Sequence, residues 1–117
     1  MTLDELRAQT KSFALRVVRL YRTLPRSADA QVMGRQLLRC GTSVAANYRA
    51  SCRARSRAEF AARIGVVVEE ADESGFWLEM LADADIVRIA LLKELLQESK
   101  ELTAIFTATQ HSVRKRV

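Results

Sequence analysis

The chain has 117 residues, of which 49% are hydrophobic, 28% are charged, four are glycine and one is proline. A chain of this length fits one hydrophobic core, and this composition disfavours disorder and turn-rich β architecture. The sequence therefore predicts a single all-α domain over residues 1–117. Its net charge of +5 comes mostly from arginine, which suits either an anionic partner or a solvated surface.

The first predicted helix begins at a capping box, in which the Thr2 hydroxyl and the Glu5 carboxylate satisfy backbone donors. Its apolar positions recur at steps of three and four, which is typical of a seam facing other helices. Pro25 ends the helix, because proline cannot continue the hydrogen-bond ladder. The seam comprises Leu3, Leu6, Thr10, Phe13, Val17, Leu20 and Leu24.

The second predicted helix is capped by Ser27 and runs to about Cys52. An amide on its apolar stripe must find hydrogen-bond partners, so Asn47 is expected to bond a neighbouring helix or to fix the helix register. A direct contact to a ligand is the alternative for Asn47. The predicted seam is Met33, Leu37, Cys40, Val44 and Asn47.

The stretch from Ser43 to Phe60 combines this polar seam residue with a basic cluster and a helix boundary. Unpaired charges are rarely buried, so the arginines of the cluster are expected to point outward, where they can hold a phosphate backbone. Tyr48 lies beside them and is expected to stack on a base. The arginines are Arg49, Arg53, Arg55 and Arg57.

Ser56 and Glu59 form a second capping box, which starts a third helix near Arg57. Its predicted seam is Phe60, Ile64, Val67, Ala71, Ser74, Leu78 and Leu81. Three further apolar residues widen this surface beyond one seam, namely Phe76, Trp77 and Met80. Either the other helices bury the wider face, or it contacts another subunit.

Carboxylates also make the third helix acidic: Glu69, Glu70, Asp72, Glu73 and Glu79. A dinuclear metal site in a helical bundle draws on Glu-x-x-His pairs, whereas the single histidine, His111, has Ala108 at that spacing. The carboxylates are therefore expected to pair with arginines, within the chain or across an interface, and no metal is expected.

Asp83 or Asp85 is expected to cap a fourth helix, and the basic end of that helix, residues 114–117, is expected to fray. Its seam is Leu92, Leu95, Ser99, Leu102, Phe106, Thr109 and Val113. Short connections join antiparallel neighbours. The sequence therefore predicts an antiparallel up-down four-helix bundle.

Motifs of common catalytic and cofactor sites are missing: there is no glycine-rich phosphate loop, Gly-x-Ser-x-Gly elbow or Cys-x-x-Cys pair. We therefore expect no enzymatic activity, no cofactor and no small-molecule substrate. No apolar run is long enough to span a bilayer, and Cys40 and Cys52 are too far apart along one helix to bridge. These features favour a cytoplasmic protein without a membrane partner.

Three segments resemble the 23S rRNA intervening-sequence proteins: SVAANYR at residues 43–49, RSRAEF at 55–60 and EEADESGFWL at 69–78. Ala45 departs from the proline that many members of that family carry. The resemblance implies an up-down four-helix bundle, and related bundles assemble as rings of five subunits. Nucleic acid is implied as the partner by association, since members are often encoded within insertions in rRNA genes.

The charge is divided unevenly along the chain, with thirteen basic and four acidic residues in residues 1–68 but six basic and ten acidic in residues 69–117. Such unlike halves can pair within the monomer or attract one subunit to the next. We therefore predict a non-enzymatic, ring-shaped homo-oligomer that binds RNA or DNA through its arginines, and the resemblance implies that the ring has five subunits. The alternative is an oligomeric scaffold with a protein partner and no nucleic acid.

Overall fold

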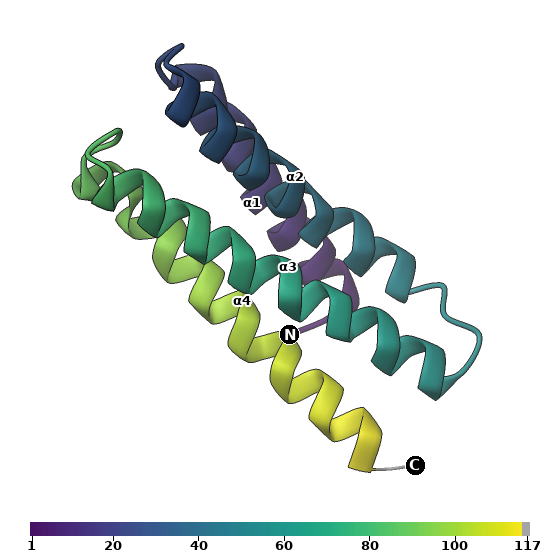
Figure 1. Ribbon diagram of the computed structural model, residues 1–117. Helices are drawn as coiled ribbons and strands as arrows, with labels where there is room; N and C mark the ends of the chain where they lie inside the picture. The colour runs from purple at the N-terminus through teal and green to yellow at the C-terminus, as the bar shows by residue number, and fades with distance from the viewer. Residues whose placement is uncertain (116–117) are drawn as a thin grey trace.

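The computed structural model describes residues 1–115, which form four helices (Figure 1). The helices are α1 (Leu3–Thr23), α2 (Ala28–Ser51), α3 (Arg57–Asp83) and α4 (Ile89–Lys115). Each runs antiparallel to the one before it, and together they fill an envelope of 47 × 22 × 19 Å. The predicted all-α, up-down bundle is confirmed. Residues 116–117 of the predicted basic end lie outside the described residues.

In both predicted capping boxes the hydroxyl caps the start of a helix. The backbone N–H of Glu5 donates to Oγ1 of Thr2 at 3.1 Å, and that of Glu59 donates to Oγ of Ser56 at 3.0 Å. Each bond satisfies a donor that the first turn of a helix leaves without an intrahelical partner. Ser27 stands at the cap position of α2, as predicted, but its side chain makes no capping bond.

The turn after α3 corrects one expectation. Asp85 has a φ of 58°, in the left-handed region that Asp tolerates better than most residues. The N–H of Ile86 then donates to the carbonyl of Leu81 at 3.0 Å, which is a bond of the Schellman motif that ends helices. The prediction that Asp83 or Asp85 caps the fourth helix is wrong, because Asp83 belongs to α3, Asp85 terminates it and α4 begins only at Ile89.

One hydrophobic core runs between the helices, and most predicted seam residues of all four helices lie in it. Leu3 is an exception, because 56% of its surface is exposed. Burial of these apolar side chains is the main source of stability in such a bundle. The buried seam residues are Leu6, Thr10, Phe13, Val17, Leu24, Leu37, Cys40, Val44, Ile64, Val67, Ala71, Ser74, Leu78, Leu81, Leu92, Leu95, Ser99, Leu102 and Phe106.

The first two helices approach each other closely because α2 carries a glycine at the contact. A Cβ atom added to Gly41 would lie 2.9 Å from Cγ1 of Val17 on α1. That distance is too short for two carbon atoms, so a larger residue would push the helices apart. Gly41 is therefore a packing position rather than a helix breaker.

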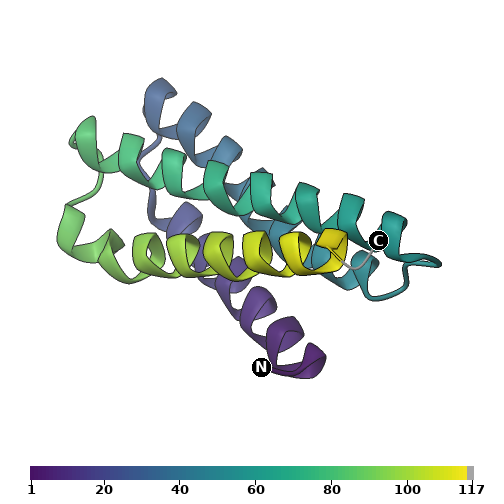
Figure 2. The same ribbon diagram turned by 90° about the horizontal axis from the view of Figure 1, so that it is seen from below.

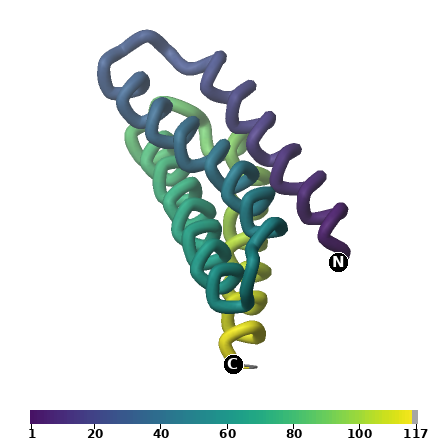
Figure 3. The backbone as a smooth tube through the Cα atoms, turned by 90° about the vertical axis from the view of Figure 1, so that its right-hand side faces the viewer, coloured from purple at the N-terminus to yellow at the C-terminus, as the bar shows by residue number. Residues whose placement is uncertain are grey.

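The bundle is open along one side. α1 packs against α2 along its length but touches α4 over only a short stretch. Figures 2 and 3 show the N-terminal half of α1 (purple) turning away from the C-terminal half of α4 (yellow). Where they do meet, Arg16 of α1 pairs with Glu98 and, at 3.8 Å, with Glu94 of α4.

Candidate nucleic-acid interface

The predicted basic cluster lies at one end of the bundle. Arg49 is in the last turn of α2, Arg53 and Arg55 lie in the α2–α3 turn, and Arg57 is the first residue of α3. All four residues are exposed. The structure therefore gathers the cluster on the surface, where an anionic partner can reach it.

Hydrogen bonds within the turn hold this cluster in place. The N–H of Arg53 donates to the carbonyl of Ala50 at 3.1 Å, and the N–H of Arg55 donates to Oε2 of Glu59 at 2.9 Å. The bond from the Arg55 backbone and the nearby Arg63 guanidinium lower the pKa of Glu59 below its usual value. The capping box of Ser56 and Glu59 thus orders the turn that carries the arginines.

Antiparallel packing adds two cations that the sequence reasoning missed. Arg7 and Lys11 lie on the first half of α1, beside the last turns of α2 where Arg49 lies. The sequence points to these two residues only indirectly. One must first infer that the start of α1 packs beside the end of α2. We call the exposed set Arg7, Lys11, Arg49, Arg53, Arg55 and Arg57 the basic surface.

A groove of about 460 Å³ lies between α1 and α2 within this surface. Three cationic residues, Arg7, Lys11 and Arg49, line it without any carboxylate among the described residues. Its remaining walls are small side chains, which leave room for a ligand: Thr10, Thr42, Ala45 and Ala46. Such a groove can accept an anion flanked by apolar atoms.

Tyr48 does not belong to this surface. It is 1% exposed, and its ring lies 5.1 Å from the ring of Phe106 on α4. Burial raises the pKa of Tyr48, and its hydroxyl has no hydrogen-bond partner among residues 1–115. The prediction that Tyr48 stacks on a base is wrong, because its ring is part of the core.

Asn47 is half-buried, and its Nδ2 donates to the carbonyl of Ser43, one turn earlier in α2, at 3.0 Å. The expected bond to a neighbouring helix is therefore replaced by a bond within its own helix. The buried stripe of α2 runs through Gly41, Val44, Tyr48 and Ser51, so Tyr48 takes the place that the sequence reading gave to Asn47.

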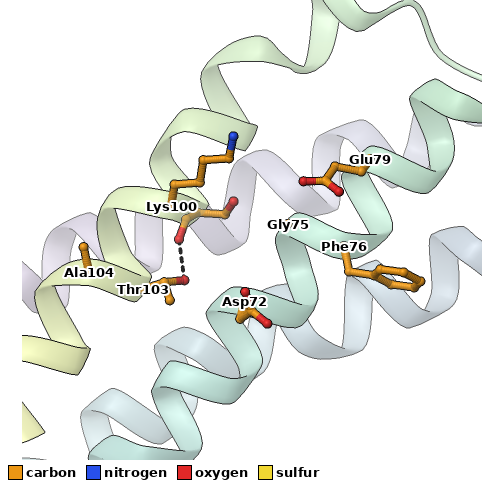
Figure 4. A pocket seen from close by; sticks show the side chains of 8 residues that line it. Asp72, Gly75, Phe76, Glu79, Lys100, Thr103 and Ala104 are labelled. Carbon is orange, nitrogen blue, oxygen red and sulfur yellow. Dashed lines mark hydrogen bonds between the residues drawn. The ribbon is translucent and has the colours of Figure 1, made fainter.

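The exposed face of α3 differs in charge. Exposed positions of α3 at steps of three and four form an acidic face, defined as Glu69, Asp72, Phe76, Glu79 and Asp83. Next to it lies a groove of about 410 Å³ between α3 and α4, lined by Asp72 and Glu79 and by Lys100 from α4. Figure 4 shows Asp72 and Glu79 on either side of Gly75, with Phe76 pointing away from α4.

The three predicted interface residues differ in exposure. Phe76 is 51% exposed, whereas Trp77 and Met80 are half-buried, and Trp77 packs against the core. The rings of Phe76 and Trp77 meet edge to face at 4.9 Å. The other helices therefore leave Phe76 uncovered, and a subunit contact at this face stays a prediction.

Other carboxylates of α3 pair with arginine within the chain, as one of the two predicted alternatives stated. Arg39 of α2 reaches Glu70 at 3.1 Å and also pairs with Glu73. These pairs join α2 to α3 on the surface, where each contributes at most about 1 kcal/mol.

Residues 1–115 contain neither a metal-binding cluster nor a membrane-spanning helix. No cluster of three or more His, Cys, Asp or Glu side chains in that range could hold a metal ion. None of the described helices is long and apolar enough to cross a membrane.

Comparisons with known proteins agree with this architecture. The profile of the 23S rRNA-intervening sequence protein family matches residues 5–108. A crystal structure of a protein of unknown function from the S23 ribosomal protein family of Bacteroides thetaiotaomicron superposes with a TM-score of 0.84. It is 30% identical, and the match covers 90% of this chain and 97% of that one. No curated protein sequence matches significantly. With most of its length matched in sequence and in fold, the chain belongs to the 23S rRNA-intervening sequence protein family.

Proposed function

We propose that this protein is a non-enzymatic, homo-oligomeric four-helix bundle of the cytoplasm that binds RNA through its basic surface. The observation that carries the proposal is the gathering of six exposed cations at one end of the bundle, from three elements and a turn. Arginine binds phosphate in a bidentate manner, and such contacts dominate affinity for nucleic acids. The description of the family, which names 23S rRNA, favours RNA over DNA.

The binding is sequence-independent in this proposal. Tyr48 is buried, and no other aromatic residue lies in the basic surface, so bases have no stacking platform there. Affinity then comes from phosphate contacts, which release counterions and weaken as salt rises.

Salt titration tests this proposal. A fluorescein-labelled hairpin RNA and a DNA of the same sequence are titrated with protein, and anisotropy is followed at several salt concentrations. The logarithm of the binding constant is expected to fall by roughly 0.7 to 0.9 per logarithm of salt for each phosphate contacted. Absence of salt-sensitive binding at low ionic strength would end the proposal.

Matched charge reversals identify the surface. The double variant with Arg53→Glu and Arg55→Glu is expected to weaken RNA binding about tenfold or more, since each substitution removes a phosphate contact. The control, Arg22→Glu with Arg26→Glu, changes net charge equally near the α1–α2 turn at the other end of the bundle. Equal weakening by both pairs would mean that the α2–α3 turn has no special role.

Self-association is the second part of the proposal, and the half-exposed Phe76 on the acidic face supports it. An odd-numbered ring needs two unlike patches on each subunit, and the acidic and basic sides of this chain provide them. The resemblance implies five subunits. Sedimentation at micromolar concentration is expected to give an oligomer that Phe76→Ser weakens.

The control for that measurement is Val32→Ser, because Val32 is 57% exposed on α2. A monomeric mass for the unmodified protein would remove the oligomer, and equal effects of the two substitutions would remove the role of Phe76.

A second candidate function is a scaffold in which the basic surface of one copy covers the acidic face of the next. The opposite charges of the two sides favour it. Under this function, Arg53→Glu with Arg55→Glu dissociates the oligomer and no RNA binds. Under the first function, the same variant keeps its mass and loses RNA affinity.

A further inference from the structure

We propose that the groove between α1 and α2 holds one phosphodiester strand of the bound RNA, with Arg7 and Lys11 on one rim and Arg49 on the other. This inference rests on the RNA binding proposed above. It adds residues of α1 to the binding site, although the basic cluster predicted from the sequence contains no residue of that helix.

Charge distinguishes this groove from the grooves that have carboxylates in their walls. The α3–α4 groove is lined by Asp72 and Glu79 as well as Lys100. A third groove, beside Arg16, has Glu94 and Glu98 in its wall, and Arg16 is already paired with both. Among these grooves, the one between α1 and α2 is lined by cations without a carboxylate.

Its cations are available to a ligand. Within residues 1–115, neither Lys11 nor Arg49 forms an ion pair. Arg7 has an exposed partner in Asp4 at 3.9 Å, and an ion pair of that length in solvent is weak. A phosphate that enters between the rims therefore breaks at most the weak ion pair of Arg7 with Asp4.

The floor of the groove explains why the ligand is a phosphodiester strand rather than a free anion. The hydroxyls of Thr10 and Thr42 donate to the carbonyls of Leu6 at 2.8 Å and Leu38 at 2.7 Å. Their donors are thus used within the helices, and the floor otherwise consists of alanines. Phosphate oxygens then bind at the rims, while the sugar between them lies against the small apolar floor.

The groove also continues the basic cluster. Arg49 lies in the last turn of α2, and Arg53 follows it four residues later in the α2–α3 turn. Lys11 and Arg7 have the same spacing along α1. A strand that leaves the α2–α3 turn at Arg53 therefore meets Arg49 next and can follow the groove.

The test compares two double variants in the full chain. One double variant, Lys11→Glu with Arg49→Glu, changes the groove. The control, Arg22→Glu with Arg35→Glu, makes the same change of net charge in the halves of α1 and α2 nearer the α1–α2 turn. All four residues are exposed, and circular dichroism checks that both proteins fold. If the groove pair unfolds, Lys11→Gln with Arg49→Gln replaces it.

Anisotropy with the labelled hairpin RNA is the readout. We expect the groove pair to weaken binding about tenfold or more and to reduce the salt slope by about 1 for each charge removed, with a smaller effect of the control pair. Inorganic phosphate is then added as a competitor, with chloride at the same ionic strength as the reference. Phosphate is expected to displace the RNA only weakly, because one phosphate ion can reach the cations of one rim only. Competition as strong as that of unlabelled RNA would assign the groove to a free anion.

The outcomes separate the two proposals. RNA binding by the unmodified protein that both pairs weaken equally would overturn the groove while leaving the proposed function standing. No RNA binding by the unmodified protein would overturn both. A third outcome is that the Lys11→Glu, Arg49→Glu variant no longer forms the oligomer in sedimentation but weakens RNA binding no more than the control variant does. That result would mean that the groove binds the acidic face of a second copy.

Discussion

Gly41 brings α2 close to Val17 of α1, and Gly75 brings α3 close to Ser99 of α4. The α1–α2 and α3–α4 pairs therefore share a way of packing, with small residues where two antiparallel helices meet. Their outer surfaces differ, because residues 1–68 carry thirteen basic and four acidic side chains, and residues 69–117 carry six and ten. Packing therefore fixes the inward positions of each helix, whereas the outward positions are free to differ in charge.

The largest expected loss of stability comes from replacing an inward-facing residue, Tyr48. Because its ring is 1% exposed and packs on Phe106, Tyr48→Ala is expected to cost about 3–5 kcal/mol of unfolding free energy. Tyr48→Phe removes only a hydroxyl without a hydrogen-bond partner, so stability is expected to stay within about 1 kcal/mol, or to rise. Urea denaturation measures both.

The same variants test the assignment of the RNA site. Tyr48→Phe is expected to bind the hairpin RNA as the unmodified protein does. A large loss of affinity with unchanged stability would return Tyr48 to the binding site.

Two glycines compare the packing of the helix pairs directly. In Gly41→Ala the new Cβ meets the branched Val17 at 2.9 Å, and overpacking of this kind costs about 1–3 kcal/mol. In Gly75→Ala the nearest atom is the Ser99 hydroxyl at 3.0 Å, which can turn aside, and alanine gains about 1 kcal/mol in helix propensity. Gly41→Ala is expected to have a lower melting temperature than Gly75→Ala in thermal unfolding. The reverse order would mean that α3 and α4 are the more tightly packed pair.

The smallest expected effect concerns the turn that joins the two pairs. The folded pKa of Glu59 lies below its usual value of about 4.3, because the carboxylate accepts from the Arg55 backbone and lies near Arg63. Its contribution to stability is therefore complete above the unfolded pKa and is lost as pH falls through the folded pKa. Glu59→Gln is expected to flatten this part of the stability profile below about pH 4.3. An unchanged profile from urea denaturation at several pH values would contradict the role of the carboxylate.

The helix starts were predictable because a capping box is local: Thr2 with Glu5 and Ser56 with Glu59 need no tertiary information. The end of α3 was not, because the left-handed conformation of Asp85 belongs to a closing turn, and aspartate is as common at the start of a helix.

The error at Tyr48 and Asn47 has a physical origin. The predicted and observed stripes of α2 share Leu37, Cys40 and Val44. They diverge after Val44, where a step of three leads to Asn47 and a step of four leads to Tyr48. In α2 the buried stripe includes Gly41 and Ser51, which carry no hydrophobic signal. The groove was hidden for another reason, since Arg7 and Lys11 join Arg49 only once the helices are paired in space.

In the proposed complex, RNA lies on the α1–α2 side and the α2–α3 turn, away from the acidic face. Hydroxyl-radical footprinting with mass spectrometry, on the unmodified protein with and without hairpin RNA, tests it most directly. We predict protection of residues 7–11 and 42–55 and unchanged reactivity of residues 69–83. Protection concentrated at residues 69–83, or the same pattern with and without RNA, would contradict the claim.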